Sequence, residues 1–111
     1  MRQIHPRFRF GRGSTPTLAF RAPVRINRKK DQVYVTFWQD NETKLELSQA
    51  DDRLVIDKYT LYAELTQADT LAFAPGLFRV QIRYLLHDGT GDVSQQMLGM
   101  VEHTQKDGEL F

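Results

Sequence analysis

The sequence contains no cysteine and no long apolar segment, and each absence excludes a class of protein. Without thiols, disulfide-stabilised folds and thiolate zinc sites are excluded. No segment approaches the roughly 20 apolar residues of a membrane helix. The basic start of the chain is also not followed by the apolar region of a signal peptide. We therefore expect a soluble protein that is made in the cytoplasm and does not contact membranes.

Acidic residues are absent from the first part of the chain. Residues 1–30 contain nine Lys or Arg and no Asp or Glu, which is a net charge of +9. Residues 31–111 contain the other six basic residues and all fourteen acidic residues, which is a net charge of −8. Opposite charges of this size favour attraction between copies of the chain, or between the basic segment and a polyanion. The alternative is a solvated basic segment that folds onto its own acidic body.

Side chains suited to catalysis or metal binding are few and scattered. His5, His87 and His103 lie far apart, without the close spacing of a metal site. Paired carboxylates act as acid and base only where burial separates their pKa values, and those of residues 51–57 are expected in exposed turns. We predict no enzymatic activity, no metal and no cofactor. A deep pocket would reopen this question if it held two or more of Asp51, Asp52, Asp57 and His87.

Alternating apolar and polar residues predict that the chain is almost entirely β-structure. Its 111 residues are enough for one domain, and 41% of them are hydrophobic. Residues 32–39 and 77–86 show the alternation best, with many β-branched and aromatic side chains. The predicted strands are residues 17–21, 32–39, 44–47, 54–56, 59–65, 77–86 and 93–101.

Turn and cap signals separate these strands. Residues 40–43 predict a hairpin turn, Pro75 and Gly76 a second turn, and residues 87–92 a hairpin loop. Thr66 and Asp69 have the spacing of a capping box. We therefore predict one short helical turn over residues 66–72.

Seven short strands separated by turns predict an all-β sandwich or small barrel. We divide the chain into a basic N-terminal arm (residues 1–12), a β-sandwich domain (13–104) and a polar C-terminal tail (105–111). Residues 1–10 can either add a strand to a sheet or extend as an arm. The predicted core consists of Leu18, Phe20, Val33, Val35, Phe37, Leu47, Ile56, Leu61, Leu65, Leu71, Phe73, Phe78, Val80, Ile82, Tyr84 and Met100.

Two groups of residues are candidates for binding. The first lies in the arm and consists of Arg7, Phe8, Arg9, Phe10 and Arg12. Alternating cations and aromatic rings can grip single-stranded nucleic acid, and they equally suit docking on an acidic neighbour. The second is the pair Tyr34 and Trp38, which share one face of a strand. This pair forms either a surface patch, which could also stack on sugars, or a second packed face of the sandwich.

Four segments resemble the pattern of one group of proteins. They are residues 12–20 (RGSTPTLAF), 33–39 (VYVTFWQ), 65–76 (LTQADTLAFAPG) and 80–83 (VQIR). In this order, over residues 12–100, they resemble small proteins encoded in the structural-gene modules of phages and prophages of Gram-positive, largely anaerobic bacteria. The layout is also similar to the immunoglobulin-like N-terminal domain of phage baseplate upper proteins. The chain differs in residues 1–10, which are longer and richer in Arg than the resemblance leads us to expect.

The resemblance implies an immunoglobulin-like β-sandwich without catalytic residues, located in the virion after synthesis in the host cytoplasm. The function we expect is that of a phage structural or adaptor protein, in the tail, connector, baseplate or head decoration. Its partners would be other phage structural proteins and further copies of the chain, reached by the arm or by strand addition. The alternative is a small nucleic-acid-binding β-domain that uses the arm. Deletion of residues 1–12 is expected to leave a folded monomer that does not join the particle.

Overall fold

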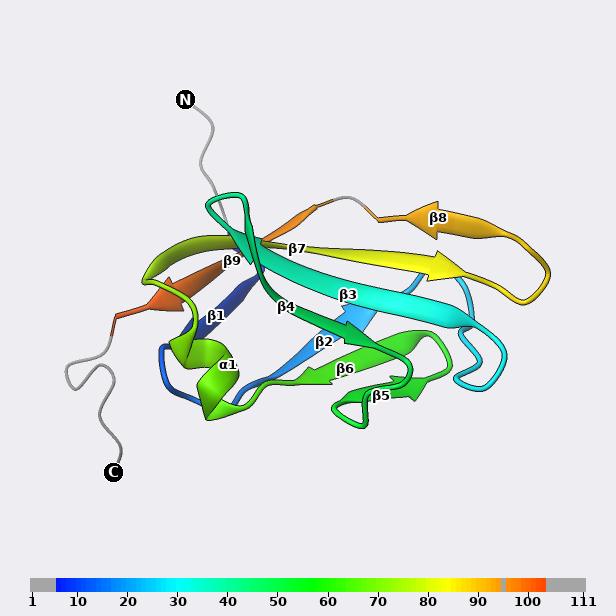
Figure 1. Ribbon diagram of the computed structural model, residues 1–111, viewed down its shortest axis with the longest axis horizontal. Helices are drawn as coiled ribbons and strands as arrows, with labels where there is room; N and C mark the ends of the chain where they lie inside the picture. Colours follow the sequence, from blue (N-terminus) through cyan, green and yellow to red (C-terminus); the bar gives the residue numbers. More distant parts are fainter. Residues whose placement is uncertain (1–5, 95, 104–111) are drawn as a thin grey trace.

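The chain folds into two stacked β-sheets, in a computed structural model that describes residues 6–94 and 96–103 (Figure 1). The predicted all-β sandwich is therefore confirmed. The described residues form nine strands rather than seven, together with the predicted helical turn. Predicted tail residues 105–111 lie outside the described residues. The elements are β1 (Phe8–Gly11), β2 (Thr17–Arg21), β3 (Gln32–Gln39), β4 (Glu42–Ser48), β5 (Leu54–Asp57), β6 (Thr60–Glu64), α1 (Gln67–Leu71), β7 (Gly76–Leu85), β8 (Gly91–Val93) and β9 (Met97–Glu102).

The strand order is that of an immunoglobulin sandwich. The larger, six-stranded sheet has the order β1-β9-β7-β3-β4, with β8 paired to β7, and the smaller sheet has the order β2-β6-β5. An immunoglobulin sandwich places strands B-E-D against strands G-F-C, and here β2-β6-β5 faces β9-β7-β3. Strands β4 and β1 extend the larger sheet at its two edges. Strand β1 runs parallel to β9, and β7 is antiparallel to its neighbours β3 and β9.

The core lies between the two sheets and follows from the alternation of each strand. Phe78, Val80 and Ile82 of β7 point inward, and Phe37 and Val35 do the same from β3. Most predicted core residues are buried. Residues that the prediction omitted are also buried: Phe10, Ala22, Ile26, Leu54, Ala63 and Val101.

Four predicted core positions are less buried than expected. Ile56 and Tyr84 pack against the core but remain partly exposed, and Leu71 is half-buried on α1. The prediction for Met100 is wrong, because the inward side of β9 carries Gly99 and Val101 and leaves Met100 half-buried on the opposite side.

The N-terminal segment is part of the sandwich. Phe10 is 5% exposed, and its ring centroid lies 5.4 Å from that of Phe78. Phe8 packs on Phe20 with ring centroids 4.9 Å apart. The backbone N–H of Arg7 donates to the carbonyl oxygen of Leu98 at 2.7 Å, which attaches the start of β1 to β9. The structure therefore does not separate residues 8–12 from the sandwich as an arm.

The predicted strand over residues 93–101 is divided into β8 and β9. Arg83 pairs with Val93, whereas continuation of the β7–β9 register would require residue 94 opposite Arg83. Ser94 occupies the break: its hydroxyl accepts from the backbone N–H of Ile82 at 2.9 Å, and its carbonyl accepts from the Gln81 side chain at 2.9 Å. A side chain thus replaces part of the ladder and shifts the register by one residue.

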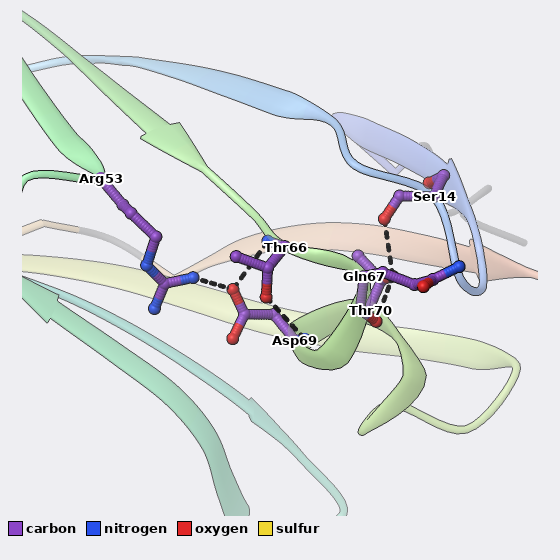
Figure 2. Close-up of polar contacts among 6 residues, drawn as sticks. All are labelled: Ser14, Arg53, Thr66, Gln67, Asp69 and Thr70. Atoms are coloured by element: carbon purple, nitrogen blue, oxygen red, sulfur yellow. Dashed lines mark hydrogen bonds and ion pairs between the residues drawn. The ribbon is translucent and has the colours of Figure 1, made fainter.

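A polar cluster fixes α1 at one end of the sandwich (Figure 2). The Thr66 hydroxyl accepts from the Asp69 N–H at 3.2 Å, and the Asp69 carboxylate accepts from the Thr66 N–H at 2.8 Å, so the capping box is complete. Asp69 also forms an ion pair with Arg53, just before β5. The buried hydroxyl of Thr70 donates to the carbonyl oxygen of Ser14 at 2.7 Å. Thr66, Asp69 and Thr70, which belong to the segment of residues 65–76, therefore have structural roles in holding α1 in place.

The β3–β4 hairpin begins with a buried glutamine. Gln39 donates through Nε2 to the carbonyl oxygens of Ala74 (2.8 Å) and Leu77 (3.2 Å), and its Oε1 accepts from the N–H of Ala74 at 2.8 Å. Asp40 and Asn41 then form the turn at φ values of 52° and 64°. Positive φ at both central residues is the requirement of a type I′ hairpin turn.

Candidate interaction surface

The side of the larger sheet that points away from the core carries exposed apolar residues. Among the described residues, five large hydrophobic side chains are exposed, and three lie here: Leu77 (41%), Leu85 (47%) and Val93 (50%). Strand register places Trp38 beside Arg79 and Tyr34 beside Arg83 on the same side. We call this surface the outer face. Its residues are Arg9, Tyr34, Thr36, Trp38, Thr43, Glu46, Ser48, Leu77, Arg79, Gln81, Arg83, Leu85, Val93, Leu98 and Met100.

One end of the outer face contains a hollow beside Trp38, which we call the Trp38 hollow. Its volume is about 320 Å³. Leu77 and Leu98 supply apolar walls, and Arg79 and Asp40 supply one charge of each sign. Trp38 is half-buried, so this predicted patch residue belongs to a partly open surface and not to a second packed face.

The other end contains a second hollow, which we call the Tyr34 hollow. Its volume is about 420 Å³, and its lining includes Tyr34, Leu85, Arg83 and Asp92. The Arg83 guanidinium lies 5.2 Å from the centroid of the Tyr34 ring, at cation–π distance. Arg83 Nη2 also lies 3.5 Å from Oε2 of Glu46. Both members of the predicted aromatic pair therefore line hollows, at opposite ends of one face.

The predicted arm residues are divided between the core and the surface. Phe8 and Phe10 pack in the sandwich, so the structure contradicts the expectation that their rings are available to stack on bases. Arg12 donates to the carbonyl oxygens of Phe73 (2.7 Å) and Leu71 (3.0 Å) at the end of α1. Arg7 and Arg9 are exposed, and partner binding by them stays a prediction.

A buried carboxylate connects two loops at one end of the sandwich. Asp31 Oδ1 accepts from the backbone N–H of His87 at 2.8 Å and from His87 Nδ1 at 2.7 Å, and Oδ2 accepts from the N–H of Asn27 at 2.7 Å. These bonds lower the pKa of Asp31, with the His87 side chain as the largest cause. The carboxylate thus stays ionised and holds the loop before β3 to the loop after β7.

The acidic residues considered for catalysis lie outside both hollows of the outer face. Asp51 accepts from the backbone N–H of Ser48 at 2.8 Å, as in a turn, and Asp52 and Asp57 are exposed. His87 pairs with Asp31. Neither hollow of the outer face is lined by Asp51, Asp52, Asp57 or His87.

Within residues 6–94 and 96–103, no group of three or more His, Cys, Asp or Glu side chains is arranged to hold a metal ion. No helix in the same residues has the length and apolar character needed to cross a membrane.

The strand order defines the class of this protein as an immunoglobulin-like β-sandwich. No protein-family model matches the chain, and no curated protein matches it.

Proposed function

We propose that this chain is a structural or adaptor protein of a bacteriophage particle, acts through protein–protein contacts and has no enzymatic activity. The outer face is the observation that supports protein binding. Leu77, Leu85 and Val93 expose apolar area between polar residues, and such area is typical of surfaces that another protein covers. The particle itself is suggested by the four sequence segments that resemble phage structural-module proteins. The location we propose is the virion, after synthesis in the host cytoplasm.

The test is to look for the chain in purified particles. Phage particles are induced from the strain that encodes the chain and are separated on a density gradient, and each fraction is analysed by mass spectrometry. We expect the chain to follow the major particle proteins at a constant ratio. A ribosomal protein of the host serves as the contamination control. A chain that is abundant in the lysate but absent from the particle fractions would contradict the proposal.

Nucleic-acid binding remains a second candidate, now by the outer face instead of the arm. Tyr34 and Trp38 are aromatic rings next to Arg83 and Arg79 on an open sheet, an arrangement that can stack bases and contact phosphates. The exposed aliphatic side chains of the same face favour protein binding instead. Gel retardation of single-stranded DNA at low and high salt separates the two. Salt-dependent retardation would favour nucleic acid, and its absence at low salt would remove this candidate.

A further inference from the structure

A third hollow lies at the side of the sandwich, between the end of β2 and the start of β9. Its volume is about 440 Å³, and its lining includes Arg21 of β2, Met97 of β9 and Arg7, which immediately precedes β1. A smaller pocket of about 50 Å³ adjoins it, since Ala22 and Ile82 line both. We call the hollow and the pocket together the side groove.

The hollow of the side groove is positively charged. Arg7 and Arg21 line it, and none of its described lining residues is acidic. The Arg7 guanidinium lies 5.8 Å from the centroid of the Phe8 ring, and the Arg21 guanidinium lies 5.9 Å from that of Tyr59. Both arginines are exposed, and neither forms an ion pair with an acidic side chain of the described residues. The hollow can therefore accept two carboxylates.

The adjoining pocket has mainly apolar walls. Its apolar and aromatic lining residues are Ala22, Pro23, Ile26, Ile82, Tyr84 and Val93. Among the described lining residues, Asp92 is the one acid, and its carboxylate accepts from the backbone N–H of Val93 at 2.7 Å. Asp92 disfavours a second acid in the pocket. The side groove therefore suits a segment in which acidic residues are followed by apolar ones.

The open edge of β2 borders the side groove. In the described sheets, β2 pairs with β6 on one side only. The Ala22 N–H donates to the Tyr59 carbonyl oxygen at 2.7 Å, which fixes the alternation of this ladder. Because alternate residues of an antiparallel strand bond the same neighbour, the backbone groups of Ala19 and Arg21 point away from β6. An extended segment can add to such an edge by main-chain hydrogen bonds.

We propose that the side groove binds residues 107–111 of a neighbouring copy of this chain. The segment reads Asp-Gly-Glu-Leu-Phe, so that two acids precede two apolar residues. Its two carboxylates meet the two arginines of the hollow, and Leu110 and Phe111 pack over the adjoining pocket. The inference rests on the proposed function, because it names a further copy as partner and the surface that this copy occupies.

Chain length favours the groove of a neighbour over the groove of the same copy. The backbone N–H of Arg7 donates to the carbonyl oxygen of Leu98, so Leu98 lies beside the groove. The chain continues along β9, and His103 lies about 16 Å further on. Residues 104–111 span at most about 28 Å when extended. The return alone would use more than half of that length, before the chain reverses and passes the edge strand β1.

Other occupants match the side groove less well. Residues 1–5 precede Arg7 closely in sequence, but they contain Arg2 and no acidic residue. They would place like charge against both arginines of the hollow. A nucleic acid would satisfy the arginines, but its phosphates would leave the apolar pocket uncovered and would be repelled by Asp92.

The test exchanges charges between the side groove and the segment. Light scattering measures the mass, and we expect the wild type to form assemblies of two or more 12.9 kDa chains at about 0.1 mM. Arg7→Glu/Arg21→Glu should weaken association at least about tenfold, because like charges then meet. Asp107→Lys/Glu109→Lys should weaken it similarly. An equal mixture of the two variants should associate as the wild type does, since opposite charges meet in both contacts. A mixture that stays monomeric would overturn the pairing.

A matched control separates the side groove from the overall charge. Arg25 and Lys29 are exposed and line neither the hollow nor the pocket, so Arg25→Glu/Lys29→Glu should leave association unchanged. A synthetic peptide of residues 103–111 should dissociate the wild-type assembly, whereas the same peptide with Leu110→Ser/Phe111→Ser should not. Each variant is checked for folding by its urea midpoint. A monomeric wild type, or an equal loss of association in the control, would overturn the inference.

The outcome is independent of the particle test. A chain that associates but is absent from purified particles would remove the proposed function and leave this contact. A monomer that is found in particles would remove the contact and leave the function. Binding of a single-stranded DNA probe that Asp107→Lys/Glu109→Lys leaves intact and Arg7→Glu/Arg21→Glu removes would instead assign the side groove to nucleic acid.

Discussion

Replacing Phe10 with alanine is expected to remove much of the stability of this domain. The ring is 5% exposed, and its centroid lies 5.4 Å from that of Phe78 and 5.8 Å from that of Phe73. Phe→Ala substitutions in a core cost about 3–5 kcal/mol. Because β1 is an edge strand that can partly collapse into the gap, we expect a loss of about 3 kcal/mol. Domains of this kind have a free energy of unfolding of about 5–15 kcal/mol.

Urea unfolding measures this loss directly. The single tryptophan, Trp38, is half-buried on β3 and reports unfolding by its fluorescence. With an m-value of about 2 kcal/mol/M, a loss of about 3 kcal/mol lowers the urea midpoint by about 1.5 M. Arg9→Ala is the matched control, because Arg9 is exposed on the same strand, and its effect should stay within about 0.5 kcal/mol. Equal midpoints for Phe10→Ala and Arg9→Ala would refute the packing of β1.

Deletion of residues 1–12 would remove part of the sandwich core. The sequence alone predicted a folded monomer that cannot join the particle. The deletion removes Phe8, Phe10 and the parallel strand β1 together. We now expect the truncated chain to unfold at a much lower urea concentration than the wild type. A failure to assemble would then report loss of the fold and not loss of a docking arm.

Substitutions at three further positions test other parts of the structure, each by urea unfolding. Gly99→Ala should cost about 1–3 kcal/mol, because the added Cβ would overlap the Phe78 ring; no change would mean that the ring does not lie over β9. Asp31→Asn should cost about 1.5–3 kcal/mol at pH 7, because it removes the charge that His87 binds. The pKa of Asp31 is lowered in the folded state, so this stabilisation is present above the unfolded-state pKa of about 3.9 and is lost as the pH falls through the folded-state pKa. The variant should therefore differ from the wild type at pH 7 and converge with it under strong acid, and a constant difference would contradict the assignment. Gln39→Leu should cost about 1–3 kcal/mol by leaving buried backbone groups without partners. Gln39→Glu removes the Nε2 donor, and full stability of this variant would contradict that role.

Regular alternation made the long strands predictable. The bounds of β3 agree with the sequence prediction, and those of β7 differ by one residue at each end, because both strands alternate between a buried and a half-open face. The helical turn was also predictable, since Thr66 and Asp69 satisfy each other within four residues. Local chemistry was sufficient wherever partners are close in sequence.

Features that depend on distant partners could not be predicted. Phe8 and Phe10 have strand spacing, but the choice between a free arm and an edge strand depends on β9, about ninety residues later in the chain. In β9, apolar residues occupy both faces, so alternation cannot distinguish Met100 from Val101, and the Phe78 ring over Gly99 decides it.

The candidate surface was predictable only in part. Tyr34 and Trp38 were recognised as a possible patch from one strand. Leu77 and Leu85 join them only because β7 is the neighbour of β3, and the two hollows exist only once the sheet is assembled.

The parallel pairing of β1 with β9 has a mechanical consequence. These are the first and last strands of the described chain, and they run in the same direction side by side (Figure 1). A force that pulls the chain apart from these two strands acts along their length. Their hydrogen bonds would then be sheared together, instead of being unzipped one after another. Such a domain resists tension better than its small size suggests, until β1 slides free as a unit.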